Sequence, residues 1–170
     1  MPFQSLLDET LEAWAYTRSG LISEIQNLSE SELKLRPNPN SRTAAEIAIH
    51  IVESGLMMAG ELSRPDGNFQ RMSYPQFIKA YAGDIPKVAK KSALIQLLKR
   101  SHAEGEKKIR SAGELHMLQW ILRFDGERGS RMAWMNHGIS HEDYHKGQVA
   151  LYARLAGRVP ALTQLIYGKS

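Results

Sequence analysis

A stripe of histidines between residues 134 and 155 constrains this chain more than any other feature. Residues three or four apart share one face of an α-helix, and here that face carries, in order, Trp134, His137, His141, His145, Gln148, Tyr152 and Leu155. The two ends of the stripe are apolar or aromatic, so we expect it to face a core. Each polar group buried without a partner costs about 1–3 kcal/mol. A metal ion is a suitable partner, because imidazole nitrogen is a good ligand for zinc, nickel, copper and iron.

Helix geometry limits which of these histidines can share one ion. Residues four apart are separated by about 6 Å along the helix axis, and residues eight apart by about 12 Å. A metal–nitrogen bond is only about 2.1 Å long. One ion can therefore take His137 with His141, or His141 with His145, but not all three. A further ligand has to come from another helix.

The spacing of apolar residues predicts three more long helices, over residues 4–28, 43–62 and 92–112. Arg18 is the one polar interruption in the first apolar stripe. Thr43 and Glu46 have the spacing of a capping box, which begins the second helix. Residues 64–91 hold Pro65, Pro75 and Pro86; a short helix is expected from Pro75, in a connection long enough to cross a bundle.

Residues 114–129 fit either a short hairpin or an ordered loop, with Asp125-Gly126 as a turn signal. Ser130 is the expected N-cap of the fourth long helix, which should end at Gly157. The apolar tail at residues 161–167 is expected to pack on the bundle or on a second subunit. Together these elements predict an all-α four-helix bundle, with a long crossover between the second and third long helices and a single domain over residues 1–170.

Composition excludes several classes of function. The chain has 170 residues and no cysteine, so a disulfide, a thiolate ligand and a thiol nucleophile are all ruled out. No apolar run approaches the roughly 20 residues that span a bilayer, and no leader segment is evident; we expect a cytoplasmic protein without a membrane partner. The basic stretch from Lys87 to Arg110 includes Glu104 and Glu106 and lacks aromatic interleaving. It indicates a solvated helix face, so a nucleic-acid partner is not expected.

At this point the motifs resemble a known family. A histidine, His50, lies early in the second helix after the start Ser-Arg-Thr-Ala-Ala-Glu at residues 41–46, and His141 and His145 lie in His-Glu-Asp-Tyr-His-Lys-Gly-Gln at residues 141–148. This constellation, from Leu11 to Gly157, is similar to the DinB-like superfamily, which includes metal-dependent hydrolases and thiol-dependent enzymes such as mycothiol-dependent maleylpyruvate isomerase and bacillithiol transferases. Lys146 departs from the arginine that the family often has there. The resemblance implies a four-helix bundle, a divalent metal on His50, His141 and His145, and frequent dimerisation.

Other residues are candidates for supporting roles. Glu46, Glu53 and Glu142 lie near a ligand in sequence and could orient an imidazole or act as a general base; Glu53, one turn from His50, is preferred. Gln148 could orient a bound water or contact a ligand. We expect His137, Trp134 and Tyr152 to line a pocket. Gly147 costs its helix about 1 kcal/mol relative to alanine, which suggests the close approach of another backbone.

Two functions remain open from the sequence. The first is a metal-dependent hydrolase or thiol S-transferase that acts on a small molecule, with zinc or nickel as the metal and any thiol supplied from outside the chain. The alternative is a non-catalytic bundle dimer, stress-related or ligand-binding, in which a metal is structural or absent. A homodimer is expected in either case.

Overall fold

Four long helices build the molecule in the computed structural model, which describes residues 5–86, 88 and 90–168. These helices are α1 (Leu6–Asn27), α2 (Ala44–Ser63), α4 (Lys91–Ala112) and α6 (Arg131–Leu155). Each lies where apolar spacing predicted it, with ends that differ by one to a few residues. Gln4, where the first helix was expected to begin, and Lys87, the first residue of the basic stretch, lie outside the described residues.

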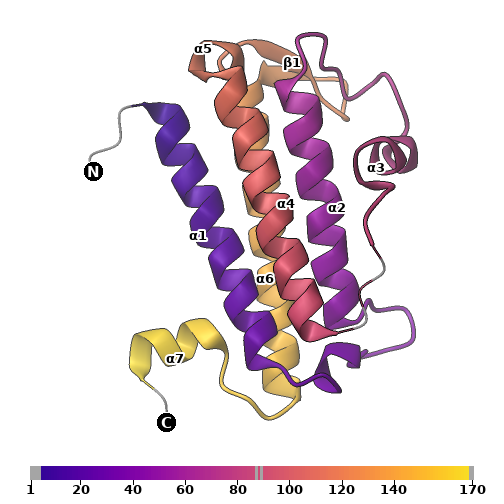
Figure 1. Cartoon of the computed structure of the whole chain (residues 1–170), viewed down its shortest axis with the longest axis vertical. Helices are drawn as coiled ribbons and strands as arrows, with labels where there is room; N and C mark the ends of the chain where they lie inside the picture. The colour runs from indigo at the N-terminus through magenta and orange to yellow at the C-terminus, as the bar shows by residue number, and fades with distance from the viewer. Residues whose placement is uncertain (1–4, 87, 89, 169–170) are drawn as a thin grey trace.

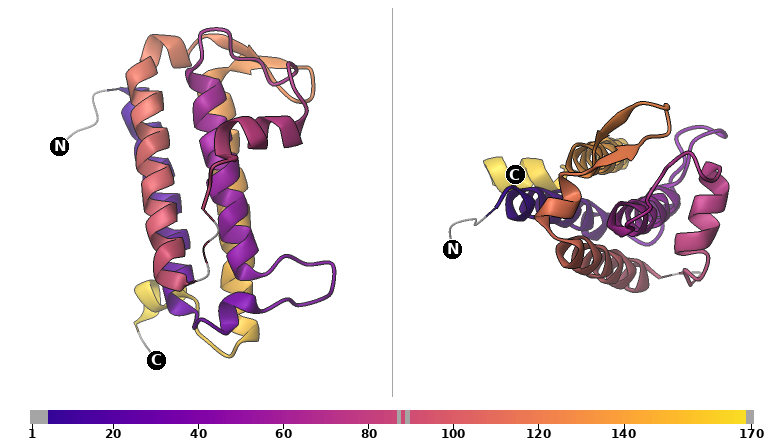
Figure 2. Two further views of the ribbon diagram at one scale, coloured as in Figure 1. Left: turned by 45° about the vertical axis from the view of Figure 1, so that its right-hand side comes forward. Right: turned by 90° about the horizontal axis from the view of Figure 1, so that it is seen from above.

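The direction of the helices explains the long connection. In Figure 1, α1 and α6 run the same way, and α2 and α4 run the opposite way. Around the bundle the neighbours follow the order α1, α4, α2, α6 (Figure 2). Since α2 and α4 are parallel neighbours, the chain has to return along the bundle between them. The described residues of this connection, 64–86, 88 and 90, do so, with α3 (Tyr74–Ala82) packed on α2. The four-helix bundle and its crossover are confirmed.

Side-chain caps begin three of the helices. Ser5 Oγ accepts from the Asp8 amide at 3.2 Å, and Ser130 Oγ accepts from the Ala133 amide at 3.0 Å. Thr43 and Glu46 form the predicted capping box: Thr43 Oγ1 accepts from the Glu46 amide at 3.1 Å, and the Glu46 carboxylate accepts from the Thr43 amide at 2.7 Å. A short 3-10 helix, η1 (Glu32–Lys34), lies in the connection between α1 and α2. These caps satisfy backbone groups that a helix leaves free at its ends.

A hairpin closes the end of the bundle where α2 finishes. After α5 (Glu114–Met117), strands β1 (Trp120–Leu122) and β2 (Arg128–Ser130) pair antiparallel, with Trp120 opposite Ser130. Gly126 in the turn has a φ of 84°, in the left-handed region that favours glycine. The Phe69 amide donates to the Leu122 carbonyl at 2.9 Å and joins the crossover to the hairpin. The hairpin is thus confirmed over the ordered loop.

The C-terminal helix α7 (Ala161–Tyr167) lies across the opposite end of the bundle (Figure 1). The buried Glu24 carboxylate of α1 accepts from the backbone amides of Ala161 and Leu162 at 3.0 and 3.3 Å. The tail therefore packs on the bundle, as one of the two expectations had it. Leu165, Ile166 and Tyr167 nevertheless remain exposed.

The core divides into two halves along the bundle axis. What we call the aliphatic half-core includes Leu21, Ile25, Leu28, Ile47, Ile51, Val52, Leu94, Leu98, Val149 and Tyr152. What we call the aromatic half-core lies toward the hairpin and includes Trp14, Met57, Phe69, Phe77, Met117, Met132, Trp134 and Met135. Both α2 and α6 contribute to each half, so the middle of these two helices marks the boundary. Within the described residues, no helix is both long enough and apolar enough to cross a membrane.

Candidate metal centre

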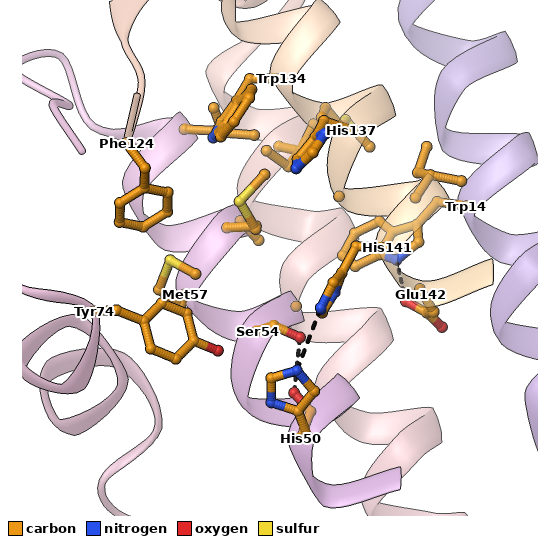
Figure 3. A pocket seen from close by; sticks show the side chains of 18 residues that line it. Trp14, His50, Ser54, Met57, Tyr74, Phe124, Trp134, His137, His141 and Glu142 are labelled. Atoms are coloured by element: carbon orange, nitrogen blue, oxygen red, sulfur yellow. Dashed lines mark hydrogen bonds between the residues drawn. The ribbon is translucent and has the colours of Figure 1, made fainter. Parts of the chain in front are cut away.

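Three histidines converge at the boundary between the two half-cores. His50 comes from α2, and His141 and His145 come from α6. The Nε2 atom of His141 lies 3.3 Å from Nε2 of His50 and 3.1 Å from Nε2 of His145. The potential ligand atoms of all three residues lie within 4.8 Å of one another. Figure 3 shows the His50 and His141 side chains pointing toward each other from α2 and α6, with a dashed line between their nitrogen atoms.

Of the two within-helix pairs that spacing allowed, the structure brings together His141 and His145. His137 lies one turn away and stacks instead on Trp134, with ring centroids 4.3 Å apart and planes at 7°. The stripe as a whole faces the core less completely than expected. His137 is exposed and Leu155 is 59 % exposed, whereas Trp134, His145 and Tyr152 are buried.

The environment keeps two of the imidazoles neutral. Burial is the largest cause that lowers the pKa of His50 to about 4, with the positive charge of Arg42 next. Burial and the neighbouring His145 lower the pKa of His141 to about 4 as well. A neutral imidazole has a free lone pair on one ring nitrogen, which is the form that binds a metal.

Gln148 orients the third histidine. Its Oε1 lies 2.8 Å from Nδ1 of His145. An amide oxygen can only accept a hydrogen bond, so Nδ1 carries the proton and donates. The lone pair of His145 is then on Nε2, which faces the other two rings. Gln148 was expected to orient a bound water or contact a ligand. In the structure it orients the His145 imidazole.

The three candidate carboxylates lie in different surroundings. Glu46 closes the capping box and pairs with Arg36 at 2.8 Å, and Glu142 points toward α1; neither orients an imidazole. Glu53 is half-buried, and among the described residues it belongs neither to the histidine cluster nor to the cavity wall. Burial raises the pKa of the Glu53 carboxyl, while the nearby Arg42 opposes this rise.

Sequence reasoning missed a buried ion pair beside the cluster. The Arg18 guanidinium donates to both carboxylate oxygens of Glu142, and Trp14 Nε1 donates to Glu142 Oε2 at 3.0 Å. Arg18 also donates to the Leu98 carbonyl at 2.8 Å. Arg18 and Glu142 are 2 % and 3 % exposed. The signal was present, because a charge inside an apolar stripe calls for a buried partner of opposite sign.

A cavity of about 270 Å³ opens from the cluster into the aromatic half-core. Its wall includes His50, His141, Trp134 and His137 (Figure 3). Tyr152 is not among the lining residues: it packs in the aliphatic half-core, and its hydroxyl donates to the Arg42 carbonyl at 2.9 Å. The pocket position expected for Tyr152 is corrected, because the cavity opens from the cluster toward Trp134, and Tyr152 lies beyond the cluster in the other direction along α6.

The expected close approach at Gly147 is also corrected. A Cβ added there would meet no atom within 4 Å apart from the helix's own backbone and its chain neighbours. The close approach occurs instead at Gly105 on α4, where a Cβ would lie 2.6 Å from Cη2 of Trp14. Trp14 fills the space that this glycine leaves between α1 and α4.

Known structures share this arrangement of helices. YfiT from Bacillus subtilis, described as "a probable metal-dependent hydrolase with an unusual four-helix bundle topology", superposes with a TM-score of 0.69 at 14 % identity, covering 93 % of this chain and 94 % of that one. The DinB-like protein YjoA from Bacillus subtilis gives 0.68 at 18 % identity, with 89 % and 93 % covered. A DinB-like protein from Bacillus cereus gives 0.67 at 15 % identity, with 94 % and 97 % covered.

At these identities the structural likeness concerns the fold. No curated protein matches the sequence. The sequence model of the DinB family, however, matches residues 1–169. With a match over nearly the whole chain, and with the bundle and its crossover in place, the chain belongs to the DinB family.

Proposed function

We propose that this protein is a metal-dependent enzyme that binds one divalent ion through His50, His141 and His145 and acts on a small molecule as a hydrolase or a thiol S-transferase. The observation that carries the proposal is the convergence of three Nε2 atoms, with separations of 3.1 and 3.3 Å from the central one. Ligand atoms bound to one ion at about 2.1 Å would lie roughly 3.0–3.4 Å from one another. The two separations from the central nitrogen match this range, and the ligand atoms of all three residues lie within 4.8 Å of one another, which supports a shared ion.

The donor set favours a nitrogen-preferring transition metal, and zinc or nickel is the ion proposed. All three donors are imidazole nitrogens. Hard ions that prefer oxygen ligands, such as magnesium and calcium, bind weakly to such nitrogens. When bound, such an ion would supply a Lewis acid with an open position, able to acidify a water or to bind a thiolate. The chain has no cysteine, so a thiol would come from an exogenous low-molecular-weight cofactor.

Two residues of the chain are assigned supporting roles in this proposal. Gln148 fixes the tautomer and the orientation of His145 through the 2.8 Å contact at Nδ1. Glu53 is the proposed general base. Its pKa is raised by burial, which makes the carboxylate a stronger base than an exposed one. Its charge also contributes, after burial, to raising the pKa of Tyr74 in the cavity wall, so Glu53 lies close enough to that residue to interact with it.

The proposal predicts the metal content of three proteins. Wild type purified from zinc- or nickel-supplemented medium should hold about one ion per chain, measured by inductively coupled plasma mass spectrometry. His141→Ala should lose it, because His141 is the central ligand. His137→Ala is the matched control: it removes a histidine from the same helix one turn away and should keep the ion. A wild type free of metal, or equal loss in both variants, would contradict the proposal.

The alternative is a stress-related or ligand-binding bundle in which the metal is structural. A structural ion carries much of the folding energy, so chelation should unfold the protein. A catalytic ion should be removable with only the loss of stability that mass action requires. The cavity beside the cluster favours the catalytic function, since it leaves room for a substrate. A screen of thiol cofactors against ester and phosphoester substrates would then separate transferase from hydrolase.

The proposal includes a homodimer in the cytoplasm. Support for the dimer comes from apolar side chains left exposed on α7 and the end of α6, including Leu155, Leu165, Ile166 and Tyr167. Apolar groups gathered at one end of a molecule are typical of association surfaces. Light scattering coupled to size-exclusion chromatography would give the mass directly. A mass near 19.1 kDa would contradict the dimer.

A further inference from the structure

The wall of the cavity is almost entirely apolar beyond the histidines. Trp134 and Phe124 form one side, with ring centroids 6.5 Å apart at 55°, and Tyr74 continues it at 6.2 Å from Phe124. Met57 and Met58 of α2 also line it (Figure 3 labels Met57). Aromatic faces and methionine thioethers make favourable contacts with flat apolar groups, and methionine adapts its shape to them.

Charge in this wall is already neutralised. Among the described residues that line the cavity there is no lysine or arginine. The one carboxylate, Glu142, is held by the Arg18 guanidinium and by Trp14 Nε1. An ion placed deep in the cavity would lose its hydration and would meet no unpaired opposite charge in return, which is costly. The cavity therefore selects against a charged group everywhere except at its histidine end.

The volume sets the size of the group. A cavity of about 150 Å³ lined by apolar side chains is known to hold benzene. The present cavity, at about 270 Å³, holds a ring with a substituent of a few atoms, but not a nucleotide or a peptide of several residues. Of the polar groups in the wall, only His50 and His141 belong to the histidine cluster, so a reacting substituent has to point toward them.

We propose that the cavity binds the uncharged, aromatic or similarly compact apolar part of the substrate, with the reacting polar group directed toward the histidine cluster. This inference rests on the proposed function for the role of the cluster, and it adds the chemical class of the substrate. Trp134, Phe124 and Met57 are then the residues that determine specificity.

Three probes with one ring and different charges test the selectivity of the cavity. These are 4-fluorobenzyl alcohol, 4-fluorobenzoate and 4-fluorobenzylammonium, and their binding to the chelator-treated, metal-free protein is followed by fluorine NMR. The neutral alcohol should bind at least about tenfold more tightly than either ion. Charged probes that bind as tightly as the alcohol would overturn the proposal.

A matched pair of glycine variants locates the site. At Gly138 of α6 an added Cβ would lie 3.1 Å from the terminal methyl of Met58, in the cavity wall, whereas at Gly147 of the same helix it would meet open space. Gly138→Leu should weaken binding of the alcohol at least about tenfold, because the new side chain enters the cavity. Gly147→Leu should leave it unchanged. Should Gly138→Leu fail to fold, Met58→Trp, from a half-buried position in the cavity wall, takes its place.

Zinc separates this inference from the proposed function. In the zinc-loaded protein, 4-fluorobenzoate should gain at least about tenfold in affinity relative to the alcohol, because its carboxylate then faces a cation. Loaded protein without this gain would overturn the orientation proposed for the polar group. A different result would be a protein that takes up no zinc but binds the alcohol, with binding weakened by Gly138→Leu. This result would contradict the proposed function and would still support the binding of an apolar group in the cavity.

Discussion

The two half-cores of this bundle are built from the same helices but from different side chains. The aliphatic half-core consists mainly of leucine, isoleucine and valine, which have few rotamers and pack closely. The aromatic half-core contains tryptophan, phenylalanine and methionine, and the cavity of about 270 Å³ lies within it. The histidine cluster lies between them. The closely packed part of the core and the binding cavity therefore occupy different lengths of α2 and α6. Substitutions that alter the cavity can then leave the packing of the aliphatic half-core unchanged.

The largest effect is expected at the boundary, where Arg18 and Glu142 are buried together. Glu142→Ala leaves the guanidinium buried without its carboxylate, which should lower the free energy of unfolding by about 3–5 kcal/mol. Urea denaturation followed by circular dichroism measures this. The double variant Arg18→Met/Glu142→Leu should regain most of the loss, because no unpaired charge remains. A double variant as unstable as the single one would mean that packing, rather than charge, sets the cost.

A matched pair of truncations compares the halves directly. Leu21→Ala in the aliphatic half-core should cost about 2–5 kcal/mol, since Leu21 is fully buried. Met57→Ala should cost less, about 2 kcal/mol at the low end of that range, because Met57 borders the cavity and has fewer contacts on that side. Chemical denaturation of both variants under one set of conditions gives the difference. Equal costs would show that the two half-cores are equally well packed.

A pH dependence is expected from Glu61, which anchors the crossover to α2. Burial alone would raise its pKa, but hydrogen bonds from Arg71, Tyr81 and the Asn68 amide outweigh burial and hold the pKa of Glu61 below its ordinary value of 4.5. A lowered folded-state pKa means that the native state binds fewer protons than the unfolded state. The stabilisation is therefore present above pH 4.5 and is lost as the pH falls through the folded-state pKa.

Glu61→Gln tests this dependence. It should lower the free energy of unfolding at neutral pH by about 1–3 kcal/mol, because the charge-assisted bonds from Arg71 weaken. The difference between wild type and Glu61→Gln should shrink as the pH falls below 4.5, in a series of denaturation curves. A difference that stays constant over this range would show that Glu61 contributes through shape and not through charge.

The smallest effect is a gain of stability at Gly147. Alanine is better than glycine in a helix interior by about 1 kcal/mol, and the added methyl meets nothing within 4 Å. Gly147→Ala should therefore raise the free energy of unfolding by about that amount. Gly105→Ala is the control with the opposite sign, because its Cβ would lie 2.6 Å from the Trp14 ring. Thermal denaturation of both variants measures whether each one is more or less stable than wild type.

Local patterns in the sequence account for most of the fold and for part of the site. Apolar spacing and the Thr43 capping box located the long helices, since both depend only on neighbours along the chain. Helical spacing left two histidine pairs open, and the family resemblance pointed to His141 with His145. The roles of Arg18, Glu142 and Glu61 were not foreseen. Their partners are contributed by other elements, and a charge in a helical stripe shows that a partner is needed without showing which one.

Most of the cavity wall escaped sequence reasoning for a related reason. Its wall combines α2, the crossover, the hairpin and α6, so residues such as Tyr74 and Phe124 become neighbours only through the tertiary fold. Trp134 was foreseen in the wall because it shares the histidine stripe. The same reasoning misplaced Tyr152. Helical spacing shows which face of α6 a residue occupies, but it does not show where along the bundle axis the cavity lies.

The position of His50 in the chain has a consequence for folding. It lies 91 residues before His141, its partner across the cluster. Contacts between distant residues form late, because the intervening chain must first be ordered. The three imidazoles can come together only after the crossover has formed and α6 has packed beside α2. Helix α6 is the last of the four long helices in the chain. Uptake of an ion by all three histidines would therefore mark the completion of the bundle, because a chain arrested before α6 docks would keep His50 on α2 apart from the His141 and His145 pair on α6.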